Sequence, residues 1–449
     1  MKCKNLLALL LCLSLLTAAL ALPVNAAPSM EPCDCGEVVQ VFMLGYGSAL
    51  YLNQGTPEQQ KVEMADTANL TPAILKLLGY MALSIVTFNA DYMAKGVSGL
   101  LMGLMGHLQM DEQGNSIGPI SADWRIDEAR DHTESPEYRF EYDYRIDPFE
   151  AADQLNDFIE RLCEVTGHEK IALTGFSEGA NVVMAYLSVY GYGRLETFLL
   201  VNGAWQGLTL VGSMLTRQVG LSGPAITNYL ADLDDGSGWL RLAMTLLRVT
   251  HLLDFTKPLG QVIVKTMGET LYREALIPLF CQMPAIWAFV PAEYYAEARK
   301  LLEGDPKYET LLARTDRYHD EVQTQAYDLL LEAQEAGVRI AVICGYNGAP
   351  VPATVQWDYH TDNLIDTARA SGGATVAPFG KTLCPSDSPY RSPDGIIDAA
   401  TCMFPDQTWF IKNLRHEDAP SKALRMWIIY SGEVPTIYGD EAFPQYLQK

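Results

Sequence analysis

Residues 171–179, IALTGFSEG, form the stretch that decides the fold of this chain. Their apolar beginning predicts a buried strand, and the apolar residues 180–189 that follow predict a helix. The last five residues match the pattern G-x-S-x-G, which places a serine on a strained strand-to-helix turn. Gly175 and Gly179 are needed because side chains there would collide with the neighbouring strand or helix. The sequence therefore predicts that the hydroxyl of Ser177 points into a cleft at the start of a helix.

Segments on either side of this motif alternate between strand and helix patterns. Strands are expected at residues 38–44, 83–88, 138–146, 197–202, 338–346 and 408–411. Helices are expected at residues 71–78 and 149–165, and another is expected to begin near residue 420. Apolar strands that alternate with helices are typical of a parallel sheet covered on both faces. We therefore expect an α/β protein with a mostly parallel central sheet.

A helical insertion is expected at residues 208–336, because strand signals are few there and helical periodicity prevails. Its helices are expected at residues 239–249, 270–279, 292–302 and 325–336. Residues 285–291, AIWAFVP, are unusually apolar for a surface segment. They indicate either a cap over an apolar cleft or a helical subdomain with a small core of its own. Residues 27–207 and 337–449 then form the two parts of the sheet domain.

The first 26 residues have the pattern of a secretory signal peptide. A basic start at residues 1–4 precedes the apolar residues 6–22, and residues 24–26 fit a small-x-small cleavage site. An uncleaved membrane anchor is the alternative interpretation. No later apolar run reaches the roughly 20 residues that span a bilayer. We therefore expect a secreted, extracellular protein.

Composition and charge exclude several classes of protein. Of the 449 residues, 49% are apolar and 19% are charged, which excludes an intrinsically disordered chain. The formal net charge is −23, from 32 Lys and Arg against 55 Asp and Glu. A nucleic-acid-binding protein needs the opposite sign. An acidic surface also weakens adsorption to anionic membranes, so any contact with lipid has to be hydrophobic.

The cysteines that follow the predicted signal peptide are few and odd in number, which argues against a disulfide scaffold. Cys384 and Cys402 are the best candidates for one disulfide. Cys344 lies in an expected strand and is predicted to be a buried thiol. The stretch Cys33-Asp34-Cys35 lacks the second cysteine pair or the histidine partners of a zinc site, so we interpret it as an N-terminal tether. We expect no metal and no cofactor.

A serine hydroxyl becomes a useful nucleophile only when a base takes its proton and an acid orients that base. In chains with this serine turn the order is serine, acid, histidine. His360 and His416 are the histidines that follow the insertion. His416 lies between the strand expected at residues 408–411 and the next helix, where the last loop of the sheet presents its base. We favour His416 and interpret His360 as an exposed loop histidine.

The acid should follow the strand expected at residues 338–346, where Asp358, Asp362, Asp366 and Asp394 are the candidates. Asp362 begins the sequence DNLI, which resembles a D-G-x-V turn that often carries the acid. Asp394 begins DGII, which resembles that turn more closely but lies farther from the strand. We favour Asp362 and keep the other three as alternatives.

Two preorganised N–H donors are needed to stabilise the oxyanion of such a reaction. One is the backbone N–H of Glu178, the residue after the nucleophile. The other is expected from the loop LGYGS at residues 44–48, where we favour the N–H of Tyr46. An ordinary glycine turn is the alternative interpretation of that loop.

With these residues in view, the chain resembles the lipases of the α/β-hydrolase fold, and in particular the lecithin–cholesterol acyltransferase-like family. Residues 142–145, YDYR, are similar to the family's Y-D-W-R segment and are likewise followed by a helix, a strand and the serine turn. Residues 204–207, AWQG, and 283–291, MPAIWAFVP, are similar to its post-strand loop and cap segment. The resemblance implies an α/β-hydrolase fold with a helical cap insertion, and cleavage of lipid esters through an acyl-serine.

Three residues depart from the family pattern. Phe176 stands where histidine is common, and Asn363 stands where the acid turn has glycine. Glu178 puts a carboxylate beside the nucleophile, where neutral residues are usual. That carboxylate is expected either to disfavour anionic acyl groups or to point to solvent.

The expected function is that of a secreted serine hydrolase that cleaves lipid esters. Ser177 is the expected nucleophile, His416 the base and Asp362 the acid, while N–H groups of Tyr46 and Glu178 form the oxyanion hole. Two alternatives remain open: an acyltransferase that passes the acyl group to an alcohol, and a non-catalytic lipid-binding protein of the same fold. The expected partner is a small-molecule or lipid ester, with transient contact to a lipid interface through the cap.

Overall fold

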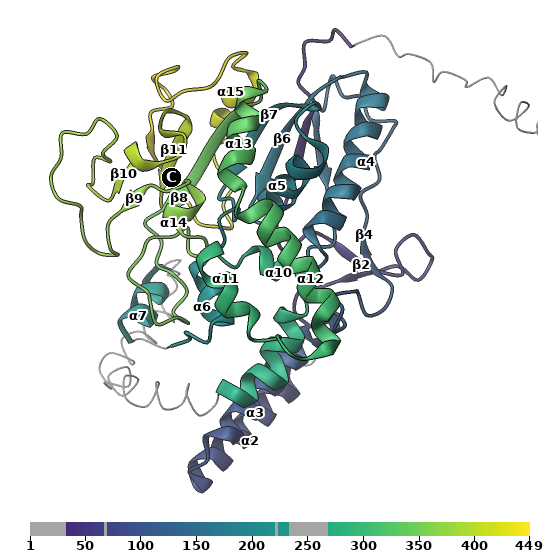
Figure 1. Cartoon of the computed structure of the whole chain (residues 1–449), viewed down its shortest axis with the longest axis vertical. Coiled ribbons are helices and arrows are strands. Elements are labelled where there is room, and N and C mark those ends of the chain that lie inside the picture. Colours follow the sequence, from purple (N-terminus) through teal and green to yellow (C-terminus); the bar gives the residue numbers. More distant parts are fainter. Residues whose placement is uncertain (1–32, 67–69, 221–222, 233–267) are drawn as a thin grey trace, which may run out of the picture.

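Seven strands form the central sheet of the computed structural model, which describes residues 33–66, 70–220, 223–232 and 268–449. The strand order is β12-β11-β8-β7-β6-β1-β5, and each neighbouring pair is parallel (Figure 1). The bounds are β1 Gln40–Met43, β5 Glu137–Phe140, β6 Ile171–Phe176, β7 Leu195–Val201, β8 Arg339–Tyr346, β11 Thr408–Lys412 and β12 Tyr446–Gln448. The predicted α/β class with a mostly parallel sheet is confirmed.

Helices cover both faces of this sheet. The main ones are α4 Pro148–Thr166, α5 Gly179–Tyr190, α13 Ala326–Glu335 and α15 Lys422–Tyr430. Successive side chains of a strand point to opposite faces. On β7, Phe198 and Leu200 therefore pack into the larger core with α4, α5 and α13, whereas Leu199 and Val201 pack into a second core with α15.

Helix α4 shows how local sequence sets the ends of an element. The side chain of Asp147 accepts a hydrogen bond from the N–H of Phe149 at 3.0 Å, and Pro148 occupies the first turn. Gly167 ends the helix with a left-handed φ of 71°, which a residue without a Cβ adopts easily. This sharp end brings His168 directly to the start of β6.

Between β1 and β5 the chain leaves the sheet and forms a helical hairpin and a small antiparallel sheet. The hairpin consists of α2 Leu70–Thr87 and α3 Ala90–Met105, which project together from the body (Figure 1). The small sheet has the order β3-β2-β4, with β2 Leu50–Leu52, β3 Gln60–Val62 and β4 Ile120–Ala122, and the 3-10 turn η2 Gly106–Leu108 follows α3. The strand predicted at residues 83–88 is wrong, because a short apolar run fits a helix as well as a strand. Residues 83–87 complete α2, and Phe88 lies in the turn after it.

The regular elements of the insertion are all helices or helical turns in the described residues 208–220, 223–232 and 268–336, and these ranges contain no named strand. Its elements before α13 are α6 Thr209–Leu215, α7 Gly223–Asp232, the π-helix η3 Tyr272–Cys281, α10 Pro284–Ala288, α11 Ala292–Arg299, the 3-10 turn η4 Pro306–Tyr308, α12 Glu309–Tyr318 and the π-helical turn η5 His319–Gln323. The helices predicted at residues 270–279, 292–302 and 325–336 correspond to η3, α11 and α13. The helix predicted at residues 239–249 lies outside the described residues.

The apolar segment 285–291 belongs to the main core. Ile286, Trp287 and Val290 pack in the same cluster as β1, α4 and α5. The indole N–H of Trp287 donates to the carbonyl oxygen of Cys281 at 2.9 Å, which satisfies the polar atom of this buried ring. The interpretation of this segment as the small core of a separate subdomain is therefore wrong.

The long connection from β8 to β11 carries only short elements in the structure. They are α14 Thr367–Ala370, β9 Thr375–Val376, β10 Ile397–Asp398, and the 3-10 turns η6 Ala399–Thr401 and η7 Pro405–Gln407. The cysteines that the structure describes are all free. Cys384 is exposed and Cys402 is buried, so the predicted disulfide between them is wrong. Cys344 is buried in β8 as predicted, and burial raises the pKa of its thiol well above the usual value.

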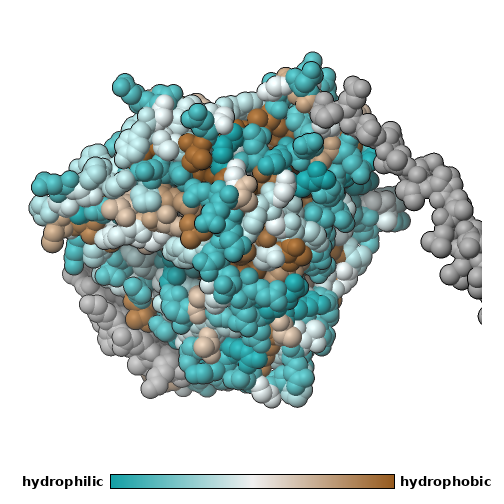
Figure 2. All heavy atoms as spheres, turned by 45° about the horizontal axis from the view of Figure 1, so that its top comes forward, coloured by the Kyte–Doolittle hydropathy of each residue, from teal (hydrophilic) through white to brown (hydrophobic). Residues whose placement is uncertain are grey.

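The molecular surface is mostly polar, with a local exception on the hairpin. The face shown in Figure 2 is largely hydrophilic, with small and separate hydrophobic areas. By contrast, α2 and the turn after it expose Leu75, Leu78, Val86 and Phe88, and Phe88 is 96% exposed. Among the described residues, no helix has both the length and the apolar character needed to cross a membrane.

Candidate active site

Ser177 lies on the sharp turn between β6 and α5. Its φ is 54°, in the left-handed region that is strained for a residue with a side chain. The turn is held by its backbone: the N–H of Ser177 donates to the carbonyl of Val201 at 3.1 Å, and the N–H of Ala204 donates to the carbonyl of Ser177 at 3.0 Å. The predicted strand, turn and helix are therefore all present.

Two glycines of the G-x-S-x-G pattern allow close packing around this turn. A Cβ on Gly175 would lie 2.9 Å from the Cα of Ala180, and a Cβ on Gly179 would lie 2.8 Å from the carbonyl oxygen of Met43. Both separations are shorter than non-bonded carbon and oxygen atoms tolerate. The collisions predicted from the sequence are thus found with helix α5 and strand β1.

The loop after β1 lies directly against Ser177. A Cβ on Gly45 would be 2.7 Å from both the Cβ of Ser177 and the backbone nitrogen of Glu178. Strands β1 and β6 are parallel neighbours, so their carboxyl ends meet here. The chain continues from β1 to β5 on one side and from β6 to β7 on the other. Such a reversal of strand order is where open α/β sheets form ligand-binding crevices.

His416 and Asp362 complete a continuous hydrogen-bonded chain with Ser177. The Nε2 atom of His416 lies 3.0 Å from Oγ of Ser177, and its Nδ1 atom lies 2.7 Å from Oδ2 of Asp362. The backbone N–H of His416 also donates to the carbonyl oxygen of Asp362 at 2.7 Å. The loops after β8 and β11 are therefore tied together at both backbone and side chain.

Asp362 is oriented by the turn that it begins. Its Oδ1 atom accepts the N–H groups of Leu364 at 3.0 Å and Ile365 at 2.7 Å, which leaves Oδ2 for the imidazole. Asn363 adopts a left-handed φ of 83°. Asparagine tolerates this region better than most residues, so it takes the place of the glycine that the acid turn usually has.

The other three candidate acids have different surroundings. Asp394 forms an ion pair with Lys412 at 2.9 Å. Asp366 accepts the backbone N–H at the start of α6 at 3.0 Å, and burial raises its carboxyl pKa. Asp358 is exposed. Asp362 is thus the candidate that the structure brings to the base.

His360 is buried, so the interpretation of it as an exposed loop histidine is wrong. Its ring packs on Phe379 with the centroids 4.9 Å apart. Burial lowers the pKa of His360 to about 4, because removal from water disfavours the charged imidazolium.

The two backbone groups predicted for the oxyanion hole belong to the residue after Ser177 and to the loop after β1, which contacts Ser177 through Gly45. Glu178 is the N-cap residue of α5, where the helix dipole supplies positive potential. Tyr46 follows Gly45 in the loop that packs against Ser177. The Tyr46 ring contacts Tyr144 with centroids 4.3 Å apart, which fixes the loop. Burial raises the phenol pKa of Tyr46.

The side chain of Glu178 turns into the protein, so the expectation that it points to solvent is wrong. The residue is 1% exposed, and its Oε2 atom has no hydrogen-bond partner among the described residues. Burial, followed by the nearby charge of Asp143, raises the pKa of the Glu178 carboxyl well above its usual value. Both effects favour the neutral acid.

A cavity of about 370 Å³ opens beside His416. Phe42, Leu44, Tyr46 and Phe176 form its apolar wall, while its charged lining residues are Glu137, Arg139, Glu417, Asp418 and Arg425. The ring of Phe176, which stands where the family has histidine, lies 5.1 Å from the imidazole of His416. The lining comes from β1 and the loop after it, from β5, from the end of β6, and from the loop after β11 with the start of α15. The sequence predicts that the loops after β1 and β11 meet near Ser177, but not that β5 and α15 complete the wall. No described residue of the insertion lines this cavity.

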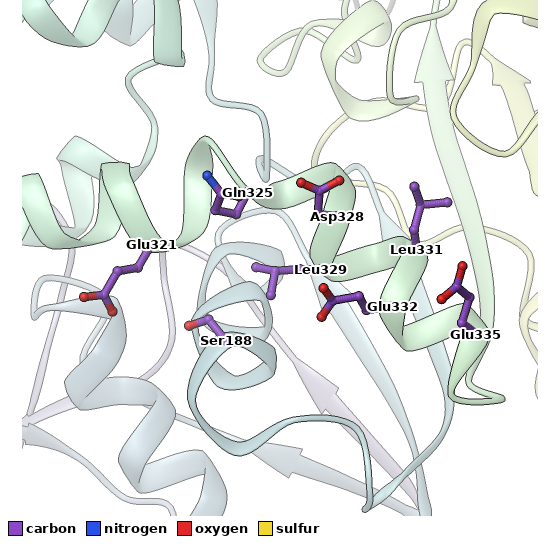
Figure 3. A pocket seen from close by; sticks show the side chains of 8 residues that line it. All are labelled: Ser188, Glu321, Gln325, Asp328, Leu329, Leu331, Glu332 and Glu335. Carbon is purple, nitrogen blue, oxygen red and sulfur yellow. The ribbon is translucent and has the colours of Figure 1, made fainter.

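Figure 3 shows a second hollow, of about 580 Å³, between α5 and the segment from η5 to α13. Its carboxylates are Glu321, Asp328, Glu332 and Glu335, and Ser188 of α5 faces the same space. The lining contains no histidine, cysteine or basic side chain that would activate this serine. The two hollows therefore differ in chemistry, and of Ser177, Asp362 and His416 only His416 lines the first hollow, while none lines the second.

Comparisons with known proteins assign no family to this chain: no family model and no curated protein matches it. Among solved structures, it is similar to a chain in the crystal structure of the Tle4-Tli4 complex. That similarity has 12% identity, covers 68% of this chain and 74% of the other, and has a TM-score of 0.27. A likeness of this degree does not establish a shared fold.

Proposed function

We propose that this protein is a serine hydrolase of the α/β-hydrolase fold that cleaves carboxylic esters. The observation that carries the proposal is the continuous chain from Ser177 through His416 to Asp362, with separations of 3.0 and 2.7 Å. This order along the chain and the serine on a strand-to-helix turn are both features of that fold. A non-catalytic protein has no need of a histidine held between a strained serine and a buried carboxylate.

The reaction follows from the geometry. Oγ of Ser177 attacks the ester carbonyl carbon as Nε2 of His416 takes the hydroxyl proton. Asp362 stabilises the imidazolium, and the N–H groups of Tyr46 and Glu178 donate to the oxyanion. His416 then gives its proton to the departing alcohol, which leaves the acyl group on the serine. A water molecule, deprotonated by the same imidazole, releases the acid.

The substrate class we propose is an uncharged ester with an apolar acyl chain. The cavity beside His416 has an apolar wall formed by Phe42, Leu44 and Phe176. The net charge of −23 disfavours polyanionic substrates. The resemblance to lecithin–cholesterol acyltransferase-like lipases supports the same class. Export is part of the proposal and depends on the predicted signal peptide at residues 1–26, which lies outside the described residues.

Acylation by a fluorophosphonate probe tests the proposal directly. Wild-type protein should be labelled and should hydrolyse p-nitrophenyl esters, whereas Ser177→Ala should lose labelling and at least about 10⁴-fold in kcat. Ser188→Ala is the matched control, since it removes another serine hydroxyl, one that lines the acidic hollow of Figure 3. This variant should keep both probe labelling and ester hydrolysis. A correctly folded wild-type protein that takes up no probe would overturn the proposal.

Product analysis separates hydrolysis from acyl transfer. In the presence of a long-chain alcohol or a sterol, a hydrolase releases free acid, while an acyltransferase forms a new ester from the same acyl-serine. Ser177→Ala should abolish either product. Free acid as the main product at saturating alcohol would support the hydrolase.

A further inference from the structure

A second chemical cluster lies at the opposite edge of the sheet from the triad. It consists of Cys33, Cys35, His132 and His168. One atom from each side chain, either a cysteine sulfur or an imidazole nitrogen, can be chosen so that all four atoms lie within 4.8 Å of one another. The statement that the Cys33-Asp34-Cys35 stretch lacks histidine partners is therefore wrong, whereas its interpretation as an N-terminal tether is not contradicted. The partners come from segments about a hundred residues away, so no local motif reveals them.

The spacing of these atoms matches a tetrahedral ion. Sγ of Cys33 lies 3.3 Å from Nε2 of His132, and Sγ of Cys35 lies 3.7 Å from Nε2 of His168. Zinc bonds of about 2.3 Å to sulfur and about 2.0 to 2.1 Å to nitrogen place neighbouring sulfur and nitrogen ligands roughly 3.6 Å apart. The two imidazole rings meet edge to face at 87°, with centroids 5.2 Å apart, so both can direct a nitrogen to one point.

The surroundings hold these ligands in place. The N–H of Cys33 donates to the carbonyl of Gly167 at 2.9 Å, which fixes the cysteine segment on the end of α4. Nδ1 of His168 lies 3.2 Å from the carbonyl oxygen of Thr166. A backbone carbonyl on Nδ1 is the usual outer partner of a metal-binding histidine, because it fixes the tautomer whose Nε2 can bind the metal. Nε2 of His168 also lies 3.2 Å from the carbonyl oxygen of Glu37, a contact that zinc binding would replace.

We propose that these four side chains form a structural zinc site. Two thiolates and two imidazoles are a complete tetrahedral set, and soft sulfur together with imidazole favours zinc over calcium, magnesium or manganese. A closed set of four protein ligands leaves no position for substrate, so the ion's role is structural.

The position of the cluster shows what the ion holds together. Cys33 and Cys35 precede β1, His132 precedes β5, and His168 precedes β6. These three strands are neighbours in the order β6-β1-β5. The ion therefore joins the amino ends of the strands whose carboxyl ends carry Ser177 and the Tyr46 loop. Metal loss should loosen the amino ends of these strands. It should not alter the triad, which lies at their carboxyl ends.

The test measures metal content and stability on the full chain. Wild-type protein purified with zinc and without chelator should carry about one zinc per chain by mass spectrometry of the metal. Cobalt in its place should give a thiolate-to-cobalt charge-transfer band. The double variant Cys33→Ser/Cys35→Ser should lose the zinc and the band, and His168→Ala should weaken zinc affinity by at least about 100-fold. Cys384→Ser and His107→Gln, which alter an exposed cysteine and an exposed histidine elsewhere, should retain both.

Chelation gives a second readout that separates this site from the ester chemistry. EDTA should lower the Tm of the wild type by roughly 5 to 10 °C and should not change that of the double cysteine variant. Fluorophosphonate labelling of Ser177 below the Tm should stay the same. Zinc-free wild type with reduced thiols that binds no added zinc would overturn the proposal. A Cys33–Cys35 disulfide in protein isolated without reductant, with no metal bound, would overturn it as well.

Discussion

The carboxyl group of Glu178 lies next to the nucleophile but outside its hydrogen-bonded chain. Its backbone N–H is the donor that we propose for the oxyanion, while its side chain is buried, and the nearby charge of Asp143 adds to the burial that raises its pKa. A neutral carboxylic acid at this point adds no negative charge beside the developing oxyanion. An ionised carboxylate would repel the negative charge of the oxyanion and would itself be poorly solvated. The residue is therefore compatible with the chemistry only in its protonated form.

Replacement of Glu178 by glutamine tests this protonation state. Because its pKa is raised in the folded protein, the folded state binds the proton more tightly, and stability falls as pH rises above the unfolded value of about 4.3. Glu178→Gln should remove that loss, which amounts to at most about 1.4 kcal/mol per pH unit, and should keep ester hydrolysis near the wild-type level. Urea unfolding at several pH values measures the free energy of unfolding and therefore this loss of stability. Exposed Glu169→Gln is the control, and an equal pH dependence in all three proteins would contradict the prediction.

The helical hairpin α2–α3 is the element whose surface departs most clearly from the polar character of the rest. It exposes Leu75 by 63%, Val86 by 76% and Phe88 by 96%, yet these side chains are not needed for its internal packing. If the substrate is a lipid ester, this surface is suited to contact the lipid interface. The contact with a lipid interface that the sequence predicts for the insertion at residues 208–336 stays a separate prediction.

Polar substitutions on the hairpin test its role at an interface. The triple variant Leu75→Gln/Val86→Gln/Phe88→Ser should lower activity on lipid emulsions or neutral vesicles by about 10-fold or more, because each large apolar side chain gains about 1.5 to 3 kcal/mol on burial. Hydrolysis of a soluble short-chain ester should not change. Lys76→Gln, at an exposed position on the same helix, is the control. Equal losses on both substrates would argue against interfacial binding.

The elements differ in how well the sequence predicts them. Strands β1, β6, β7 and β8 are nearly continuous apolar runs, and such runs have few alternatives in a parallel sheet. The pattern at residues 83–88 predicts a strand wrongly, because a run of six residues with four apolar ones fits a helix as well as a strand. Chain order and position in the fold favour His416, and they restrict the acid to Asp358, Asp362, Asp366 and Asp394, of which the sequence DNLI favours Asp362. Chain order does not predict the complete cavity wall or the zinc ligands, because each depends on contacts between segments far apart in sequence.

At the scale of the whole molecule, acid should destabilise the fold through buried His360, whereas buried Glu178 favours the folded state at low pH. His360 is held neutral, with a pKa of about 4 against about 6.5 when unfolded. The unfolded chain therefore binds the extra proton first, and stability falls as pH drops from about 6.5 to about 4. Asp394 and Asp232 favour the charged imidazole and Lys412 opposes it, but burial prevails.

His360→Gln should reduce this acid sensitivity. We expect the wild type to lose roughly 3 kcal/mol more than the variant between pH 6.5 and 4, since one pKa unit corresponds to about 1.4 kcal/mol. Denaturant unfolding across that range measures the difference. His107→Gln, which changes an exposed histidine, should follow the wild type. A variant as acid-sensitive as the wild type would show that His360 is protonated in the folded protein.

The insertion between β7 and β8 also determines when the triad can exist. Ser177 precedes it, whereas Asp362 and His416 follow it, and His416 lies on the last loop before α15. A ribosome or a translocation channel releases residues in order, so the nucleophile emerges long before its base. A nascent chain, or a fragment cut anywhere before residue 416, holds a serine with no partner to activate it. The proposed ester cleavage therefore requires a chain that extends through residue 416.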